Sequence, residues 1–520
     1  MSATMKNTLS RGKGNKDLLH HTGAIARQWE EDAPVTLHGY MPFFAEYLHS
    51  GGLFERLVSN CPLRFTSNNA PKVPDVIGTM VVSILSGHTR YCHAQSLYGD
   101  TVVPDLLGIG KMVSHDSLRR AFINIDEKDA ENWLRAELLR CQEPLLSEKY
   151  VLDLDPTVKP LYGGQEGAEV GYNPKKPGRP SHCLHTYCVA KSRLIIDAEV
   201  HPGKETAGRH SHAGLWELLD NRLPVRLHPY LIRGDIGFGN ESTMSGCEAR
   251  GKFFLFKLRQ SLNVKRLIVE LQNESINWVN AGGGWQGCER LLLLQGWSKS
   301  RRVIVLRRQE RREGKRDGKQ KLLGAGKDDA QGELLFPEIV ADDEIPQFEW
   351  AVLITNLEQP IETVAQLYRE RGDCENAFDE LKNQWGWGGF TTQDIKRSSI
   401  MARLIALVYN WWNIFCRLAD PEKHMEARTS RPMLQNVIGR LANHGGKRLI
   451  HLTAVGAQAA KTRAVYDKIS AFLSSIQATA AQLTREAKWA AILKRAFVKY
   501  LGERAPQAIA DGPQLLLLLA

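Results

Sequence analysis

The sequence predicts an α/β core built on a mixed sheet, interrupted by a β-rich insertion and flanked by helical segments at both ends. Strand-like runs that alternate with helical stretches from about residue 150 to 259 indicate the core. A second group of strand-like runs follows to about residue 355, before helical periodicity resumes after Pro360. With 520 residues, the chain is long enough for several domains of about 100–200 residues each.

The first 145 residues are expected to form helices joined by polar loops. Ser114 is suited to cap a helix that runs to Phe122, in which Leu118 and Phe122 share the apolar side. Two adjacent arginines, Arg119 and Arg120, lie in the same helix. Such a helix suits contact with the major groove of DNA, although an ordinary surface helix shows the same pattern.

Acidic residues mark two strands of the core. Over residues 151–157, the alternation of a strand places Asp153 and Asp155 on one face. Burying two carboxylates is costly unless a cation or a donor meets them, so both are candidates for a site. Asp235 ends an apolar run that starts at Pro229, where functional groups collect at the carboxyl ends of strands. The glycines around it would let a substrate approach closely.

The insertion is expected to contain four strands, near residues 276–279, 290–294, 303–307 and 349–354. Its middle is strongly basic, because residues 299–321 contain eleven Lys or Arg and three Asp or Glu, a net charge of +8. A solvated hairpin is the ordinary explanation of such a run. The density of charge favours an arm that faces phosphates.

A helical pattern in the last third of the chain brings four functional groups together. Tyr368, Arg371, Glu375 and Lys382 project within about 60° of one another if they share one helix. One carboxylate flanked by two cations and a phenol suits a site for metal and phosphate. A surface helix with an Arg371–Glu375 ion pair is the alternative, and Asp379 is a weaker candidate for the carboxylate role.

The overall charge favours an anionic partner. The chain has 68 Lys and Arg against 58 Asp and Glu, a net charge of +10, and nucleic acid is the commonest such partner. Nine cysteines, an odd number with no Cys-x-x-Cys pair, argue against a disulfide framework and for a reducing cytoplasm. The apolar window at 398–419 contains Arg403 and Asn410, so a buried helix is expected there rather than a membrane span.

Several of these residues fall within motifs that resemble a known family. The pattern Tyr368-x2-Arg371-x3-Glu375-x6-Lys382 is similar to the Tyr-Arg-Glu-Lys signature of bacterial insertion-sequence transposases of the DDE superfamily. The resemblance includes Asp155-Pro-Thr-Val, Arg-Gly-Asp235-Ile-Gly-Phe and the stretch 162–182, and it covers residues of about 150–415. It implies an RNase H-like catalytic core, with the β-rich insertion between the second Asp and the Glu.

The resemblance also implies the chemistry. Asp155, Asp235 and Glu375 would be catalytic and would hold two Mg²⁺ ions, for which Mn²⁺ can substitute. The enzyme would cleave double-stranded DNA at the terminal inverted repeats of its element and transfer the 3′-OH ends to target DNA (cut-and-paste), through a DNA hairpin. Side chains expected to bind DNA are Tyr368, Arg371 and Lys382 of the signature, and Lys175, Lys176 and Arg179 of a proline-stiffened loop at 174–180.

These expectations divide the chain into five segments. They are a helical DNA-end-binding domain (1–145), the first part of the RNase H-like core (146–259), the β-rich insertion (260–355), the second part of the core with the Glu helix (356–420), and a helical C-terminal domain suited to dimerisation (421–520). A homodimer is expected when two DNA ends are brought together, in the cytoplasm and associated with the nucleoid, with no membrane partner. Two alternatives stay open: a metal-dependent RNase H-like nuclease or resolvase, and a DNA-binding derivative without catalysis.

Overall fold

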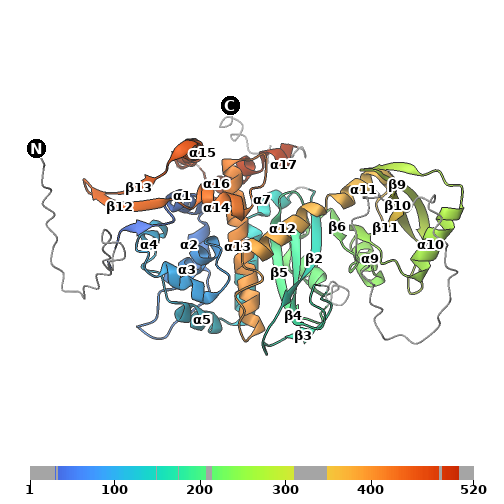
Figure 1. Ribbon diagram of the computed structural model, residues 1–520, viewed down its shortest axis with the longest axis horizontal. Helices are drawn as coiled ribbons and strands as arrows, with labels where there is room; N and C mark the ends of the chain where they lie inside the picture. The colour runs from blue at the N-terminus through green and yellow to red at the C-terminus, as the bar shows by residue number, and fades with distance from the viewer. Residues whose placement is uncertain are drawn as a thin grey trace, which may run out of the picture.

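The computed structural model describes residues 30, 33–147, 149–173, 175–205, 213–309, 348–478 and 483–502. Along its long axis, a helical part formed by both ends of the chain lies at one end and strands β8–β11 lie at the other (Figure 1). The long helix α13 (Ile395–Ala419) stands between the helical part and the central strands.

A ten-stranded mixed sheet forms the core. In its first half the strands follow the order β5–β4–β2–β6–β7, in which β2 is antiparallel to β4 and parallel to β6. The mixed sheet with helices against it confirms the α/β class. In this order the strands span Leu194–Pro202, Pro180–Val189, Val151–Pro160, Leu231–Gly234 and Phe253–Lys257, and the short β3 (Glu169–Val170) also pairs with β4.

The strands of the insertion continue the same sheet rather than starting another. β11 pairs antiparallel with β7, and β10, β9 and β8 follow it in an antiparallel run. The strands expected at 290–294, 303–307 and 349–354 overlap three of these, whereas the one expected at 276–279 begins only at Val279. The strands and their two neighbouring helices are β8 (Val279–Gly282), β9 (Trp285–Leu292), β10 (Arg301–Gln309), β11 (Phe348–Thr355), α9 (Glu241–Ala249) and α10 (Leu262–Asn273).

α13 is the buried helix expected from residues 398–419. Nearly all of its side chains are buried, and several of its polar side chains bond within the protein. Asn410 accepts from the amide of Ile195 at 2.9 Å and donates to its carbonyl at 2.8 Å, while Arg403 donates to Asp197 at 2.8 Å. Within the ranges given above, no helix is long and apolar enough to cross a membrane.

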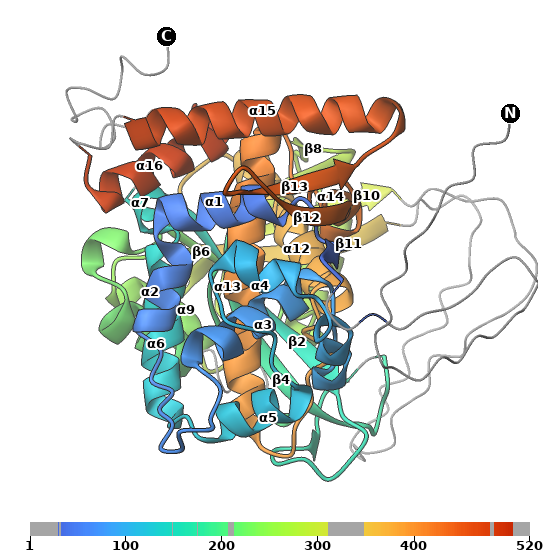
Figure 2. The same ribbon diagram turned by 90° about the vertical axis from the view of Figure 1, so that its left-hand side faces the viewer.

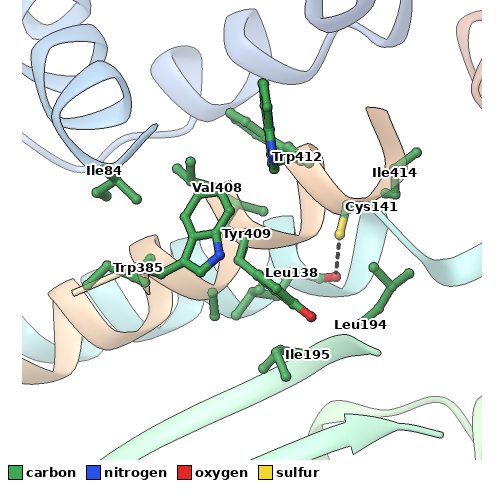
Figure 3. Packing of buried hydrophobic residues seen from close by; sticks show 14 of the residues in the cluster. Ile84, Leu138, Cys141, Leu194, Ile195, Trp385, Val408, Tyr409, Trp412 and Ile414 are labelled. Carbon is green, nitrogen blue, oxygen red and sulfur yellow. Dashed lines mark hydrogen bonds between the residues drawn. The ribbon is translucent and has the colours of Figure 1, made fainter. Parts of the chain in front are cut away.

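Aromatic side chains fill the space between α13 and the elements around it. Trp385, Tyr409 and Trp412 are almost completely buried there (Figure 3). The indole nitrogen of Trp385 donates to Glu380 at 3.0 Å, so this side chain is satisfied inside the core.

Most of the N-terminal helices pack with the C-terminal elements on the side of α13 away from the main sheet (Figure 2), whereas the helix that contains Arg135 also contacts β5 through Asp197. Ser114 caps α5 by accepting from the amide of Ser117, and Leu118 and Phe122 are buried, as the sequence predicts. The N-terminal elements are α1 (Met41–Gly51), α2 (Leu53–Ser59), α3 (Val73–Leu85), η1 (Tyr91–Leu97), α4 (Val102–Leu107), α5 (His115–Ile123), α6 (Glu127–Arg140) and α7 (Glu143–Leu146). The C-terminal helices are α14 (Ala427–Leu434), α15 (Gly456–Ala478), α16 (Arg485–Ala496) and α17 (Val498–Gly502).

The expectation of helix throughout the C-terminal segment is wrong for residues 438–453. They form a β-hairpin of β12 (Ile438–His444) and β13 (Lys447–Thr453), and β12 pairs with β1 (Val35–Thr36) near the start of the chain. The turn residues Gly445 and Gly446 both have positive φ, which glycine adopts without strain. A Gly-Gly pair between two short alternating runs is the signal that predicts such a hairpin.

Candidate active site

Asp155 and Asp235 lie on neighbouring parallel strands at almost the same level. β2 and β6 are in register through Leu154 and Gly234, so the next residue of each chain segment is an aspartate. Asp235 follows directly after β6 and accepts from the amide of Gly237 at 2.9 Å, which fixes the turn. The two acids therefore meet where the strand β6 ends, the edge at which open α/β sheets place functional groups.

Gly234, beside Asp235, makes room for the side chain of Phe238. The sequence had led us to expect that glycine here would let a substrate approach closely. A Cβ atom on Gly234 would lie 2.6 Å from the ring of Phe238, a distance that no real side chain tolerates. This glycine allows the turn after β6 to fold back tightly on the strand.

Asp153 is engaged elsewhere, although it shares the face of Asp155. It is fully buried and binds Arg233 of β6 through two charge-assisted hydrogen bonds, of 2.5 and 2.7 Å. Arg233 also donates to the carbonyl of Leu367. This buried pair accounts for the charge of Asp153 and leaves Asp155 as the acid of β2 that faces the site.

The signature residues lie on two helices rather than on the single helix expected. α11 (Ile361–Arg369) contains Tyr368, and α12 (Gly372–Gln384) contains Glu375 and Lys382. Between them the backbone stays in the α-helical region at Arg371, and its amide bonds to the carbonyl of Tyr368, three residues back. The tighter turn, followed by the helix-weakening Gly372, breaks the helix at this point.

Arg371 joins the acids of the site. Its guanidinium donates to Asp155 at 2.6 Å from one nitrogen and to Glu375 from another. The Arg371 side chain is 7% exposed, against 20% for Asp155 and 57% for Glu375, so the cation lies beneath the two carboxylates. Its Nε is buried with no hydrogen-bond partner among the described residues, which leaves one donor of the fork free.

The electrostatics of the site reflect this crowding of charge. Burial raises the pKa of Asp155 to about 7, with Arg371 opposing the shift and Asp235 and Glu375 adding to it. Burial also raises the pKa of Tyr368 to about 12, so its hydroxyl keeps its proton and is a donor at neutral pH. Asp235 and Glu375 are thus both close enough to Asp155 to act on it, and Tyr368 lies beside them.

Lys382 approaches the same place from the far end of α12. Burial and the nearby Lys175 lower its pKa, while Asp379 and Asp155 oppose that shift. Lys175 is exposed on the loop after β3, so the loop and α12 bring two cations together near Asp155. Asp379 itself is exposed and accepts a hydrogen bond from Asn383 at 2.7 Å.

The basic loop expected at 174–180 gathers around an exposed tyrosine. Lys176 donates to the hydroxyl of Tyr162, and the charged groups of Lys176 and Arg179 lie 5.0 and 4.9 Å from the centre of its ring. Tyr162 is 68% exposed, so the cluster faces solvent. Pro174 lies outside the described residues.

A family comparison bears directly on this site. The family described as "Transposase DDE domain" matches residues 146–411, half of the chain. This chain belongs to the DDE transposase family. It is therefore an enzyme of DNA transposition, one that cleaves DNA and transfers strands, and the matched range holds Asp155, Asp235 and Glu375.

Other comparisons add little. One solved structure with a similar chain is "Cryo-EM structure of piggyBac transposase synaptic complex with hairpin DNA (SNHP)", at 11% identity and a TM-score of 0.34, covering 93% of this chain and 89% of that one. A likeness at that level carries no weight for fold or function. No curated protein gives a significant match.

The three acids of this transposase suit a divalent cation in their donor chemistry. Carboxylate oxygens are hard ligands of the kind that Mg²⁺ and Mn²⁺ prefer. Among the described residues, however, no group of three or more His, Cys, Asp or Glu side chains is arranged to hold a metal ion. Arg371 occupies the space between Asp155 and Glu375, so its guanidinium supplies there the positive charge that a metal would supply.

No sequence pattern assigned a role to Lys159 or Tyr162. Lys159 shares the face of Asp155 on β2, is 5% exposed and donates to the carbonyl of Gly389 at 2.5 Å. Burial lowers its pKa to about 8. The alternation of β2 was sufficient to place Lys159 on the face of the acids, whereas nothing local marked Tyr162 as the centre of a basic loop.

The basic run at 299–321 is only partly described, up to Gln309. Arg301 and Arg302 form ion pairs with glutamates within the protein, and Arg307 and Arg308 lie over aromatic rings. The rest of the run, from 310 onward, lies outside the described residues. The phosphate-facing arm stays a prediction.

Proposed function

We propose that this transposase belongs to a bacterial insertion sequence of the Tyr-Arg-Glu-Lys branch, and that it moves its element by cut-and-paste. It binds the terminal inverted repeats as a homodimer, cleaves there, and transfers the 3′-OH ends to target DNA in the cytoplasm. The strands β5–β4–β2–β6–β7 form its RNase H-like core. We propose that the five segments expected from the sequence are its domains, with the roles given there.

The observation that carries the proposal is the meeting of Asp155, Asp235 and Glu375 around Arg371. The acids come from a central strand, the end of a neighbouring strand and a helix beyond the insertion. Asp235 and Glu375 nevertheless both raise the pKa of Asp155. Chains that merely bind DNA have no need to crowd like charges in this way. Carboxylates that lie close together are costly unless a cation binds them, and this supports a catalytic role for the three acids.

In this proposal, Asp155, Asp235 and Glu375 would hold two Mg²⁺ ions, which would supply positive charge at the scissile phosphodiester. Arg371 would bind a phosphate through its unpaired Nε–H and through the nitrogens that donate to Asp155 and Glu375 in this structure. Tyr368 donates through its protonated hydroxyl, and Lys382 contributes a point charge.

The basic loop extends the same surface. Lys175 lies near Lys382, and Lys176 and Arg179 are held over the ring of Tyr162, so their charges are kept at one exposed place. We propose that these three side chains grip the backbone of the DNA end next to the cleavage site. An exposed cluster of this kind suits phosphate contacts rather than the reading of bases.

The test compares wild type with Glu375→Gln, which keeps the size of the side chain and removes its charge. Both proteins are incubated with Mg²⁺ and DNA that includes the sequence flanking the gene of this protein, and cleaved and joined products are measured. We expect wild type to cleave at the element boundary and to join ends. We expect the variant to lose at least about a hundredfold of that activity, because a missing charge at a metal site is felt directly in the transition state.

Asp379→Asn is the matched control. Asp379 is exposed on the same helix one turn after Glu375, so this change removes an equal charge without touching the proposed ligands. Its activity should stay within about threefold of wild type. Cleavage without joining in wild type would favour the nuclease or resolvase, and DNA binding without any cleavage, even with Mn²⁺, would favour the non-catalytic derivative.

A further inference from the structure

We infer that the outer face of the β12–β13 hairpin is a second binding surface for double-stranded DNA, apart from the catalytic centre. The hairpin extends from the helical part of the molecule at the end opposite to β8–β11 (Figure 1). The inference rests on the proposed function, in that it assumes that the chain handles DNA.

The pairing of the strands defines which side chains share this face. Arg440 lies opposite His451, and His444 lies opposite Lys447 across the hairpin, so all four project to the same side. All four are exposed. Arg440 and His444 are four residues apart on β12, which places the two ends of the cluster about 13 Å apart along the strand.

The opposite face is occupied by the protein. Leu452 packs against the main core, and Arg448 forms an ion pair with Asp105 of α4. Within the described part of the chain, neither Arg440 nor Lys447 forms an ion pair of this kind. The outer face therefore carries positive charge that the described residues leave unneutralised.

The surrounding sequence is depleted of acids. From Ala427 to Tyr466 the chain contains seven Lys and Arg and no Asp or Glu over 40 residues. An average surface mixes both signs of charge, and a strip of one sign attracts a polyanion. A twisted two-stranded ribbon is also one of the shapes that a groove of DNA admits.

Apolar side chains on the same face raise the competing possibility of a protein partner. Ile438 and Leu449 are 52% and 46% exposed, and β13 is the edge strand of its small sheet. A second copy of the chain would, however, bring an equal set of cations against this one. Repulsion between the two sets disfavours self-association, so DNA is the occupant that matches the charge.

The test measures DNA affinity across a series of salt concentrations for wild type and for the double variant Arg440→Gln/Lys447→Gln. Fluorescence anisotropy of a labelled duplex, without divalent metal, reports binding independently of cleavage. Each lost phosphate contact reduces the slope of log K against log salt by about 0.9, so we expect a slope flatter by about 1.8 and an affinity at least tenfold weaker at low salt.

Lys423→Gln/Lys468→Gln is the control. Both lysines are exposed, and neither is in the hairpin, so the same two charges are removed from other surfaces. We expect this protein to keep a slope within about 0.5 of wild type. Thermal unfolding and far-UV circular dichroism of each variant verify that the fold is intact.

Two results would overturn the inference. In one, the hairpin variant binds DNA with the affinity and slope of wild type. In the other, it changes the oligomeric state in sedimentation experiments while its DNA binding is unchanged, which would make the face a contact between subunits. If the proposed catalytic function were wrong, wild type would not cleave DNA, but it would still bind DNA more tightly than the hairpin variant.

Discussion

At the scale of single residues, two aspartates on one face of β2 have different fates. Asp153 is enclosed with Arg233, whereas Asp155 lies at the surface of the site beside Arg371 and two further acids. When the partner of a buried charge is removed, that charge is left uncompensated in a medium of low polarity. The free energy of unfolding then falls far more than when a partly exposed ion pair is broken.

We therefore expect Asp153→Asn to lower the free energy of unfolding by about 3–5 kcal/mol, because Arg233 would stay buried without a counter-ion. Asp155→Asn should change stability by less than about 1 kcal/mol and abolish DNA cleavage. Urea denaturation followed by tryptophan fluorescence measures the first effect, and the cleavage assay measures the second. Equal loss of stability in both variants would contradict the division of roles.

At the scale of elements, Arg301 ties the start of β10 to α9. Its nearly buried guanidinium binds Glu241 at 2.5 Å and Glu248 at 2.8 Å. Burial by itself raises the pKa of Glu241, but the hydrogen bonds from Arg301, Ser245 and Ser298 outweigh it and lower that pKa to about 2. The folded protein thus holds this carboxylate in its charged form.

This depressed pKa predicts a loss of stability in acid. The unfolded chain binds a proton at Glu241 near its ordinary pKa of 4.5, while the folded chain binds it only near 2, so the stabilisation is complete above about 4.5 and falls as the pH drops toward 2. In wild type, the urea midpoint should fall more steeply between pH 5 and pH 2.5 than in Glu241→Gln. Parallel curves for the two proteins would refute this.

At the scale of the whole molecule, α13 joins the N-terminal and C-terminal helices to the main sheet. Asn410 bonds to both backbone groups of Ile195 on β5, while Arg403 of α13 and Arg135 of α6 share Asp197 of the same strand. These buried polar contacts fix the position of the helix on the sheet, because an alternative packing would leave them without partners.

Asn410→Leu should therefore destabilise the transposase by about 1–3 kcal/mol, since the buried amide of Ile195 loses its acceptor. The carbonyl of Ile195 keeps a bond from Gln142, which limits the cost. Asn443→Leu, on an exposed position of β12, is the control and should stay within about 0.5 kcal/mol of wild type. Chemical denaturation of the three proteins measures both values.

Features that depend on neighbours along the chain could be predicted from the sequence. The alternation of β2, the serine cap of α5 and the apolar density of α13 act over a few residues, and the structure has each of them. The order of the three acids and the motif around them was likewise visible, and it led to the family that the comparison shows.

Contacts between residues that are distant in the sequence could be seen only in the folded protein. Asp153 pairs with Arg233 across 80 positions of sequence, and Arg371 binds Asp155 across 216. The strand β12 pairs with β1 across about 400 positions. No local pattern specifies such a pairing, because it depends on which strands and helices the folded core brings side by side. The acids could be predicted from the sequence, whereas their partners depend on how the folded core packs.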